Sequence, residues 1–78
     1  MKVIHHGARE GVTGSCHQLF WEKGKSLLVD CGTFQGDDAR RHPNPEIEFS
    51  LRGIECLLLT HVHIDHAGRL PYLLAAGF

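Results

Sequence analysis

The residues best suited to chemistry in this sequence lie together in one short stretch. Three histidines and one aspartate occupy four of the six positions from 61 to 66, as His61, His63, Asp65 and His66. Imidazole nitrogen and carboxylate oxygen are ligands that zinc binds well, and manganese and iron also accept them. Such a density of ligand types rarely arises by chance, so the stretch predicts a metal site.

The spacing of these residues suggests how they converge. In an extended chain, alternate side chains share a face, so His61, His63 and Asp65 are expected to point the same way. The two residues between them, Val62 and Ile64, would then point into apolar packing. No cysteine belongs to the group, which argues against a closed, Cys-rich structural zinc site.

Two metal ions side by side also fit this arrangement. A turn after Asp65 could bring His66 next to it, so that this pair serves a neighbour of the ion held by His61 and His63. A two-metal site can activate water and bind a phosphoryl or acyl oxygen from both sides. The cluster therefore predicts a hydrolase.

The elements on either side would hold the cluster at a sheet edge. We expect a strand at Ile54–Thr60. Its centre, Cys56–Leu59, is apolar throughout, which is typical of a strand that is covered on both faces. A helix is predicted to begin near Pro71, since proline is tolerated in a first turn. The cluster then lies beyond the C-terminal end of a strand, where open α/β folds place their active sites.

The earlier part of the chain predicts an extended start and an antiparallel hairpin. Lys2–His6 is expected to be extended, and Ser15–Glu22 should pair with Ser26–Asp30 across a glycine turn. From Gly32 to Arg52, turn-forming and charged residues predict no regular structure beyond one helical turn, capped by Asp37 or Asp38. Strands followed by a helix predict a mixed α/β (α+β) fold.

Composition limits the compartment and the partners. The 78 residues suffice for one small domain or part of a larger one, and 8 basic against 9 acidic residues give a net charge of −1, which offers no argument for nucleic acid. No apolar run can span a bilayer, and no signal peptide is recognisable. The three cysteines, Cys16, Cys31 and Cys56, are expected to be buried free thiols of a cytoplasmic protein.

Several motifs resemble a known superfamily. The residues from His61 to His66 match the HxHxDH signature of the metallo-β-lactamase superfamily at every specified position. Three further stretches resemble its β-CASP branch of RNA-processing nucleases: Gly11–Cys16 (GVTGSC), Leu28–Gly36 (LVDCGTFQG) and Ala67–Pro71 (AGRLP). The resemblance implies an αββα sandwich, to which residues 1–78 would contribute the N-terminal strands and one helix after the metal motif.

The same resemblance implies roles for individual residues. His61 and His63 would hold a first zinc ion, and Asp65 and His66 a second. Asp65 would thus act in catalysis, supported by Asp30, which matches an early aspartate that forms hydrogen bonds and does not bind the metal. The implied reaction is hydrolysis of RNA phosphodiester bonds by metal-activated water.

The chain lacks the later metal ligands of the superfamily, so it is expected to be an N-terminal portion that is inactive alone. Two alternatives remain open. One keeps the fold and changes the substrate to a thioester or a lactam. The other is a non-catalytic metal-binding or interaction module, which would self-associate through the edge of an incomplete sheet.

Overall fold

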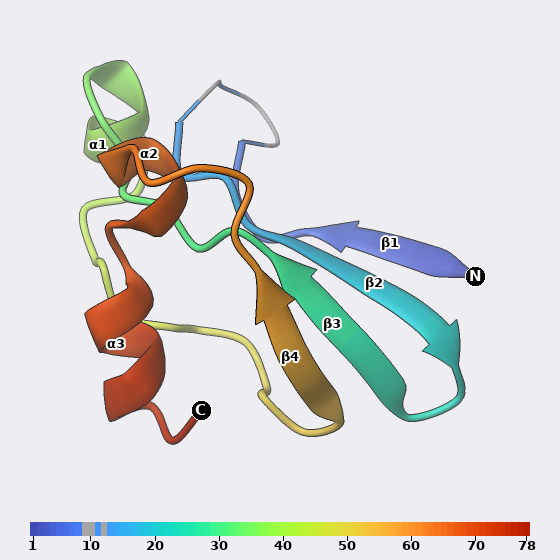
Figure 1. Ribbon diagram of the computed structural model, residues 1–78. Helices are drawn as coiled ribbons and strands as arrows, with labels where there is room; N and C mark the ends of the chain where they lie inside the picture. Colours follow the sequence, from blue (N-terminus) through green and yellow to red (C-terminus); the bar gives the residue numbers. More distant parts are fainter. Residues whose placement is uncertain (9–10, 12) are drawn as a thin grey trace.

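The structure of the protein is a computed structural model that describes residues 1–8, 11 and 13–78. Its centre is one four-stranded sheet with the strand order β1-β2-β3-β4 (Figure 1). The strands are β1 (Lys2–His5), β2 (His17–Glu22), β3 (Lys25–Val29) and β4 (Ile54–Leu58). The first three strands pair antiparallel, and β4 pairs parallel to β3. The predicted mixed α/β fold is confirmed.

The predicted hairpin is present as β2 and β3. Gly24 joins the two strands with a φ of 77°, a left-handed conformation that glycine adopts without a steric cost. Leu19 lies opposite Leu27 in the antiparallel register. β3 ends at Val29, one residue earlier than predicted, and Asp30 follows with a φ of 64°. The predicted loop before this hairpin includes residues 9, 10 and 12, which lie outside the described residues.

The connection between β3 and β4 contains α1 (Asp37–Arg41) and an irregular segment. Gly36 occupies the N-cap of α1, and the two aspartates predicted as caps lie within its first turn. The following segment is irregular, as predicted, but Ile47, Phe49 and Leu51 pack against the core. This segment therefore covers one face of the sheet.

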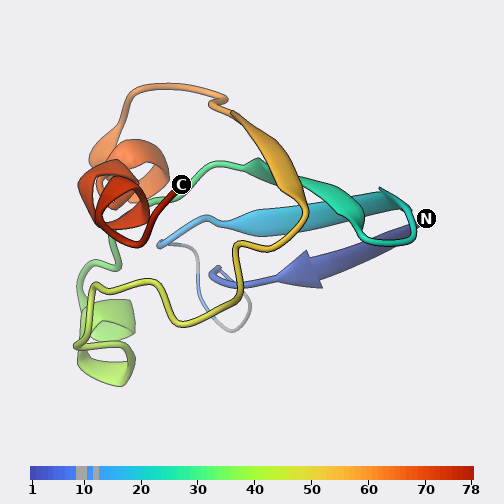
Figure 2. The ribbon, with the colours of Figure 1, turned by 90° about the horizontal axis from the view of Figure 1, so that it is seen from below.

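The fully buried core is small. Among the residues that the structure describes, its apolar members are Cys16, Leu28, Cys31 and Leu73. Leu73 belongs to α3 (Leu70–Ala75), whose first turn contains a proline as predicted. The helices α1, α2 (Ile64–Ala67) and α3 gather at one side of the sheet in both views (Figures 1 and 2).

The prediction that β4 is covered on both faces is wrong for this structure. Leu58 is 54% exposed and Cys56 is also exposed. The reason is that successive side chains point to opposite faces: Leu57 packs against the core, whereas the face with Cys56 and Leu58 is left uncovered by the described residues. Cys16 and Cys31 are buried free thiols, as predicted. Within the described part of the chain, no helix has the length and apolar character needed to cross a membrane.

Candidate metal centre

Three of the predicted ligands converge in the structure. His61, His63 and Asp65 each offer one ligand atom, and these atoms lie within 4.8 Å of one another. Donors about 2.1 Å from a single zinc ion can be at most ~4.2 Å apart. Both imidazoles are exposed, so a small rotation about their side-chain bonds closes this difference. The donor set and its spacing fit a zinc ion.

The convergence does not come from the extended chain that the sequence suggested. The chain turns into α2 immediately after His63, which is the N-cap residue, and Asp65 lies in the first helical turn. As a result, Val62 and Ile64 do not point into apolar packing but are 81% and 56% exposed. Three of the predicted ligands thus lie together in the structure, but through a local conformation that the sequence did not predict.

His66 lies beside Asp65, and its orientation is fixed by Asp30. The Nδ1 atom of His66 is 2.7 Å from Oδ2 of Asp30, so the imidazole donates its Nδ1 hydrogen to this carboxylate. The other ring nitrogen, Nε2, is then free to bind a metal. It lies 3.5 Å from Oδ2 of Asp65, close to the ~3.3 Å that separates two ligands of a tetrahedral zinc ion.

Asp30 is a buried carboxylate with several hydrogen-bond donors. Besides His66, Thr60 donates its backbone N–H to Oδ1 and its hydroxyl to Oδ2, each at 2.7 Å. Burial opposes ionisation of Asp30, but the hydrogen bonds from His66 and Thr60 outweigh it and lower its pKa. The left-handed backbone of Asp30 is a conformation that aspartate tolerates better than most residues. Asp30 therefore stays charged and holds His66.

Backbone hydrogen bonds clamp the Asp65–His66 region to the rest of the fold. The N–H groups of Ser15 and Cys31 donate to the carbonyls of Asp65 and His66, at 3.0 and 2.8 Å. Gly32 lies so close that a Cβ atom there would overlap the carbonyl oxygen of Asp65. A glycine at this position is thus a requirement of the site.

Three polar residues beside the cluster were not singled out as a group by the sequence. The Ser15 hydroxyl lies 3.0 Å from Nε2 of His17, and Nδ1 of His17 lies 2.8 Å from Nδ1 of His5. Burial, and then the neighbouring His5, lower the pKa of His17. The sequence gives little indication of this group, because the two imidazoles are brought together by the register of β1 with β2, in which His5 lies opposite His17.

The two buried thiols lie against each other beneath this region. Cys16 donates a hydrogen bond to Cys31, and this bond and burial raise the pKa of the Cys16 thiol. Both side chains belong to the buried core, while the backbone of Cys31 holds the carbonyl of His66. The prediction of burial is wrong for Cys56, which is exposed on the same face of β4 as Leu58.

Comparison with known proteins agrees with the site. The profile of the Metallo-beta-lactamase superfamily matches residues 18–78. Ribonuclease TTHA0252 of Thermus thermophilus is 42% identical over 78 residues, which cover 100% of this chain. Cleavage and polyadenylation specificity factor subunit 3-II of Arabidopsis thaliana is 39% identical over 75 residues, 85% of this chain. Endoribonuclease YSH1 of Kluyveromyces lactis is 38% identical over 74 residues, 95% of this chain.

The chain spans only 18%, 11% and 10% of the length of these three relatives. Within that span, the relatives confirm the predicted resemblance to RNA-processing nucleases of the β-CASP branch. The superfamily implies binding of a divalent metal, for which the His61–Asp65 cluster is the candidate site. With the superfamily profile matching most of its length, the chain belongs to the metallo-beta-lactamase superfamily.

Proposed function

We propose that this chain carries the first metal ligands of a zinc-dependent ribonuclease that hydrolyses RNA phosphodiester bonds. The convergence of His61, His63 and Asp65, whose ligand atoms lie within 4.8 Å of one another, is the observation that carries the proposal. The ribonuclease names of relatives such as Ribonuclease TTHA0252 support RNA as the substrate.

Each residue has a distinct part in this proposal. His61 and His63 hold one zinc ion, and Asp65 and His66 hold a second beside it, since Asp65 lies within 4.8 Å of the imidazole donors of the first. Asp30 accepts the Nδ1 hydrogen of His66, which leaves Nε2 of that ring for the metal. Zinc supplies Lewis-acid stabilisation of the phosphoryl oxygens and activation of water.

These 78 residues supply only part of such a site. Zinc ions usually have four ligands, while this assignment gives each ion two from the chain. We therefore propose that residues 1–78 form part of a larger metallo-β-lactamase-like domain and bind metal without hydrolysing RNA on their own. The free thiols Cys16 and Cys31 support a reducing, cytoplasmic location.

The first test is the zinc-to-protein ratio of the chain purified without chelator, measured by elemental mass spectrometry. A ratio of one or two is expected, and it should fall in a His63→Ala, Asp65→Asn double variant. A short RNA should remain intact in the presence of the zinc-loaded chain. A ratio near zero at saturating zinc would contradict metal binding, and cleavage of the RNA by the zinc-loaded chain would contradict the proposal that these residues do not hydrolyse RNA on their own.

The alternative proposal, a non-catalytic interaction module, concerns the free edge of the sheet. We propose that β4 pairs antiparallel with β4 of a second copy, since its outer edge has no partner among the described residues. In a register centred on Cys56, Glu55 of one copy lies opposite Leu57 of the other, so no like charges meet. In the same register the exposed Leu58 would lie opposite Ile54 of the other copy and extend the apolar contact.

This register is directly testable, because it brings the two Cys56 thiols opposite each other. Mild oxidation should give a disulfide-linked dimer in the unsubstituted chain and none after Cys56→Ser. Sedimentation should show concentration-dependent dimers, which Leu58→Lys abolishes by placing a charge on the edge. A chain that stays monomeric at all concentrations would overturn this proposal and leave the metal site unaffected.

A further inference from the structure

We infer that Arg69 is a positioning residue that holds Asp65 and His66 in the geometry the metal needs. This inference rests on the proposed metal site. Arg69 follows the ligand stretch and is 4% exposed, although its side chain carries a charge. Charged side chains are seldom buried unless their hydrogen bonds are satisfied.

The Arg69 side chain bridges two segments that are distant in sequence. Its Nε–H donates to the carbonyl of Gly32, and its Nη2 lies 3.5 Å from the carbonyl of Gly14. The guanidinium carbon lies 4.7 Å from the centre of the Phe34 ring, a cation–π contact. One planar group thus binds both segments at once.

The two bridged segments are those that fix the ligands. Gly14 precedes Ser15, whose N–H donates to the Asp65 carbonyl, and Gly32 follows Cys31, whose N–H donates to the His66 carbonyl. The backbone N–H of Arg69 itself donates to the Cys31 carbonyl at 2.9 Å. Arg69 therefore holds together the two segments whose N–H groups bind the carbonyls of Asp65 and His66.

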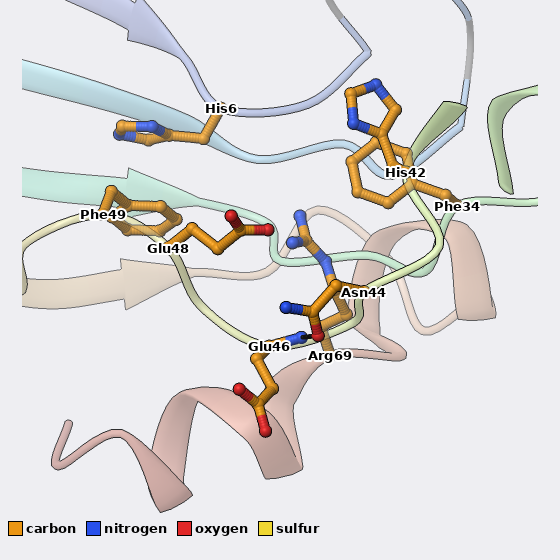
Figure 3. A pocket seen from close by; sticks show the side chains of 8 residues that line it. All are labelled: His6, Phe34, His42, Asn44, Glu46, Glu48, Phe49 and Arg69. Atoms are coloured by element: carbon orange, nitrogen blue, oxygen red, sulfur yellow. Dashed lines mark hydrogen bonds between the residues drawn. The ribbon is translucent and has the colours of Figure 1, made fainter. Parts of the chain in front are cut away.

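The surroundings of the guanidinium show why arginine is needed there. It points into a cavity of about 150 Å³, between Phe34 and the Glu48 side chain (Figure 3). Among the residues that the structure describes, no ion pair joins it to a carboxylate. Its partners are carbonyl dipoles in two directions, which suits the fixed fork of arginine and not the point charge of lysine.

The test compares Arg69→Met and Arg69→Lys with Arg40→Met, which removes an 85% exposed arginine far along the chain. Each chain is titrated with Co²⁺, whose visible absorption bands report ligand number and geometry. We expect a ~10–100-fold loss of Co²⁺ affinity and altered bands for Arg69→Met, as for other residues that orient metal ligands. Arg69→Lys should recover only part of the affinity, and Arg40→Met should match the unsubstituted chain.

Amide hydrogen exchange without metal gives a second readout. In the Arg69 variants, the amides of Ser15 and Cys31 should exchange faster, while those of Leu19 and Leu28 in the sheet keep their protection. Folded Arg69→Met with unchanged Co²⁺ affinity and unchanged exchange would overturn the inference. If the unsubstituted chain binds no Co²⁺, the proposed metal site fails, and the exchange result alone decides the role of Arg69.

Discussion

The two halves of the candidate metal site are held in different ways. His61 and His63 are exposed; their rings meet edge to face at 4.9 Å between centroids, and the His61 ring also lies 3.8 Å from the ring of His66. Asp65 and His66 are half-buried, begin a helix, and are clamped through their carbonyls. One half is therefore ordered by the fold, and the other is left for the metal to order.

The difference lies in the environment of the imidazoles. The buried Asp30 carboxylate sets which nitrogen of His66 carries the hydrogen. Among the described residues, the side-chain hydrogen-bond partner of His61 is the exposed Thr60 hydroxyl, 3.2 Å from Nδ1. Ordering an exposed side chain on binding costs roughly 0.5–1.5 kcal/mol, a cost that His66 has already met through folding.

Removing Asp30 should have the largest effect, because it takes away the anchor of the ordered half. Asp30→Ala should lower the free energy of unfolding by about 3–5 kcal/mol, from lost charged hydrogen bonds and from a left-handed backbone that alanine disfavours. Asp30→Asn keeps the shape and tolerates that backbone, so a smaller loss of about 1–3 kcal/mol is expected. Urea denaturation followed by circular dichroism measures both.

The control for this comparison is Asp37→Asn, since the Asp37 side chain is 83% exposed. Its stability should stay within ~0.5 kcal/mol of the unsubstituted chain. If Asp30→Ala and Asp37→Asn lowered the free energy of unfolding by the same amount, the hydrogen bonds of Asp30 would make no specific contribution to stability.

Removing a ligand from either half should give the next largest effect. The binding free energy of zinc at sites with four ligands is ~10–16 kcal/mol in total. Divided among the ligands, this makes one well-ordered ligand worth roughly 100-fold in zinc affinity. We expect His66→Ala to lose about this much and His63→Ala to lose several-fold less. Competition with a coloured zinc chelator measures both constants, and His42→Ala, at the end of α1, should leave them unchanged. Identical losses in both halves would contradict the difference in their ordering.

The smallest expected effect is a pH dependence through His17, which lies beside the ordered half. Its folded pKa is lowered by burial and by His5, so the unfolded chain binds this proton more readily. Stability should therefore fall as the pH drops below about 6.5, the unfolded value. His17→Asn should flatten this part of the curve of unfolding free energy against pH. An unchanged slope in the variant would contradict the assignment to His17.

The sequence was sufficient to predict the strands of the sheet and to single out His61, His63 and Asp65, which the structure also brings together. The hairpin turn at Gly24 and the apolar run of β4 are local signals, and both led to correct elements. The sequence was insufficient where the local structure depends on contacts between residues far apart along the chain. The start of α2 at Ile64 follows from the clamp to residues 15 and 31–33, which no local pattern reveals.

One missed signal was present in the sequence. Ile47, Phe49 and Leu51 alternate with polar residues, which is typical of a segment with one face on a core, and all three pack there. By contrast, the apolar run of β4 predicted burial without indicating what would cover it. Leu58 is nevertheless exposed. The composition of a strand therefore indicates that it favours a buried environment, but not which segment would cover it.

The bond between Asp30 and His66 has a consequence for the order of folding. It joins residues 36 positions apart, whereas the β2–β3 hairpin closes over a short turn. Local hairpins form within ~1–10 μs, before such distant contacts. The metal ligands should thus come together late, after the rate-limiting barrier, so bound zinc would slow unfolding far more than it speeds folding.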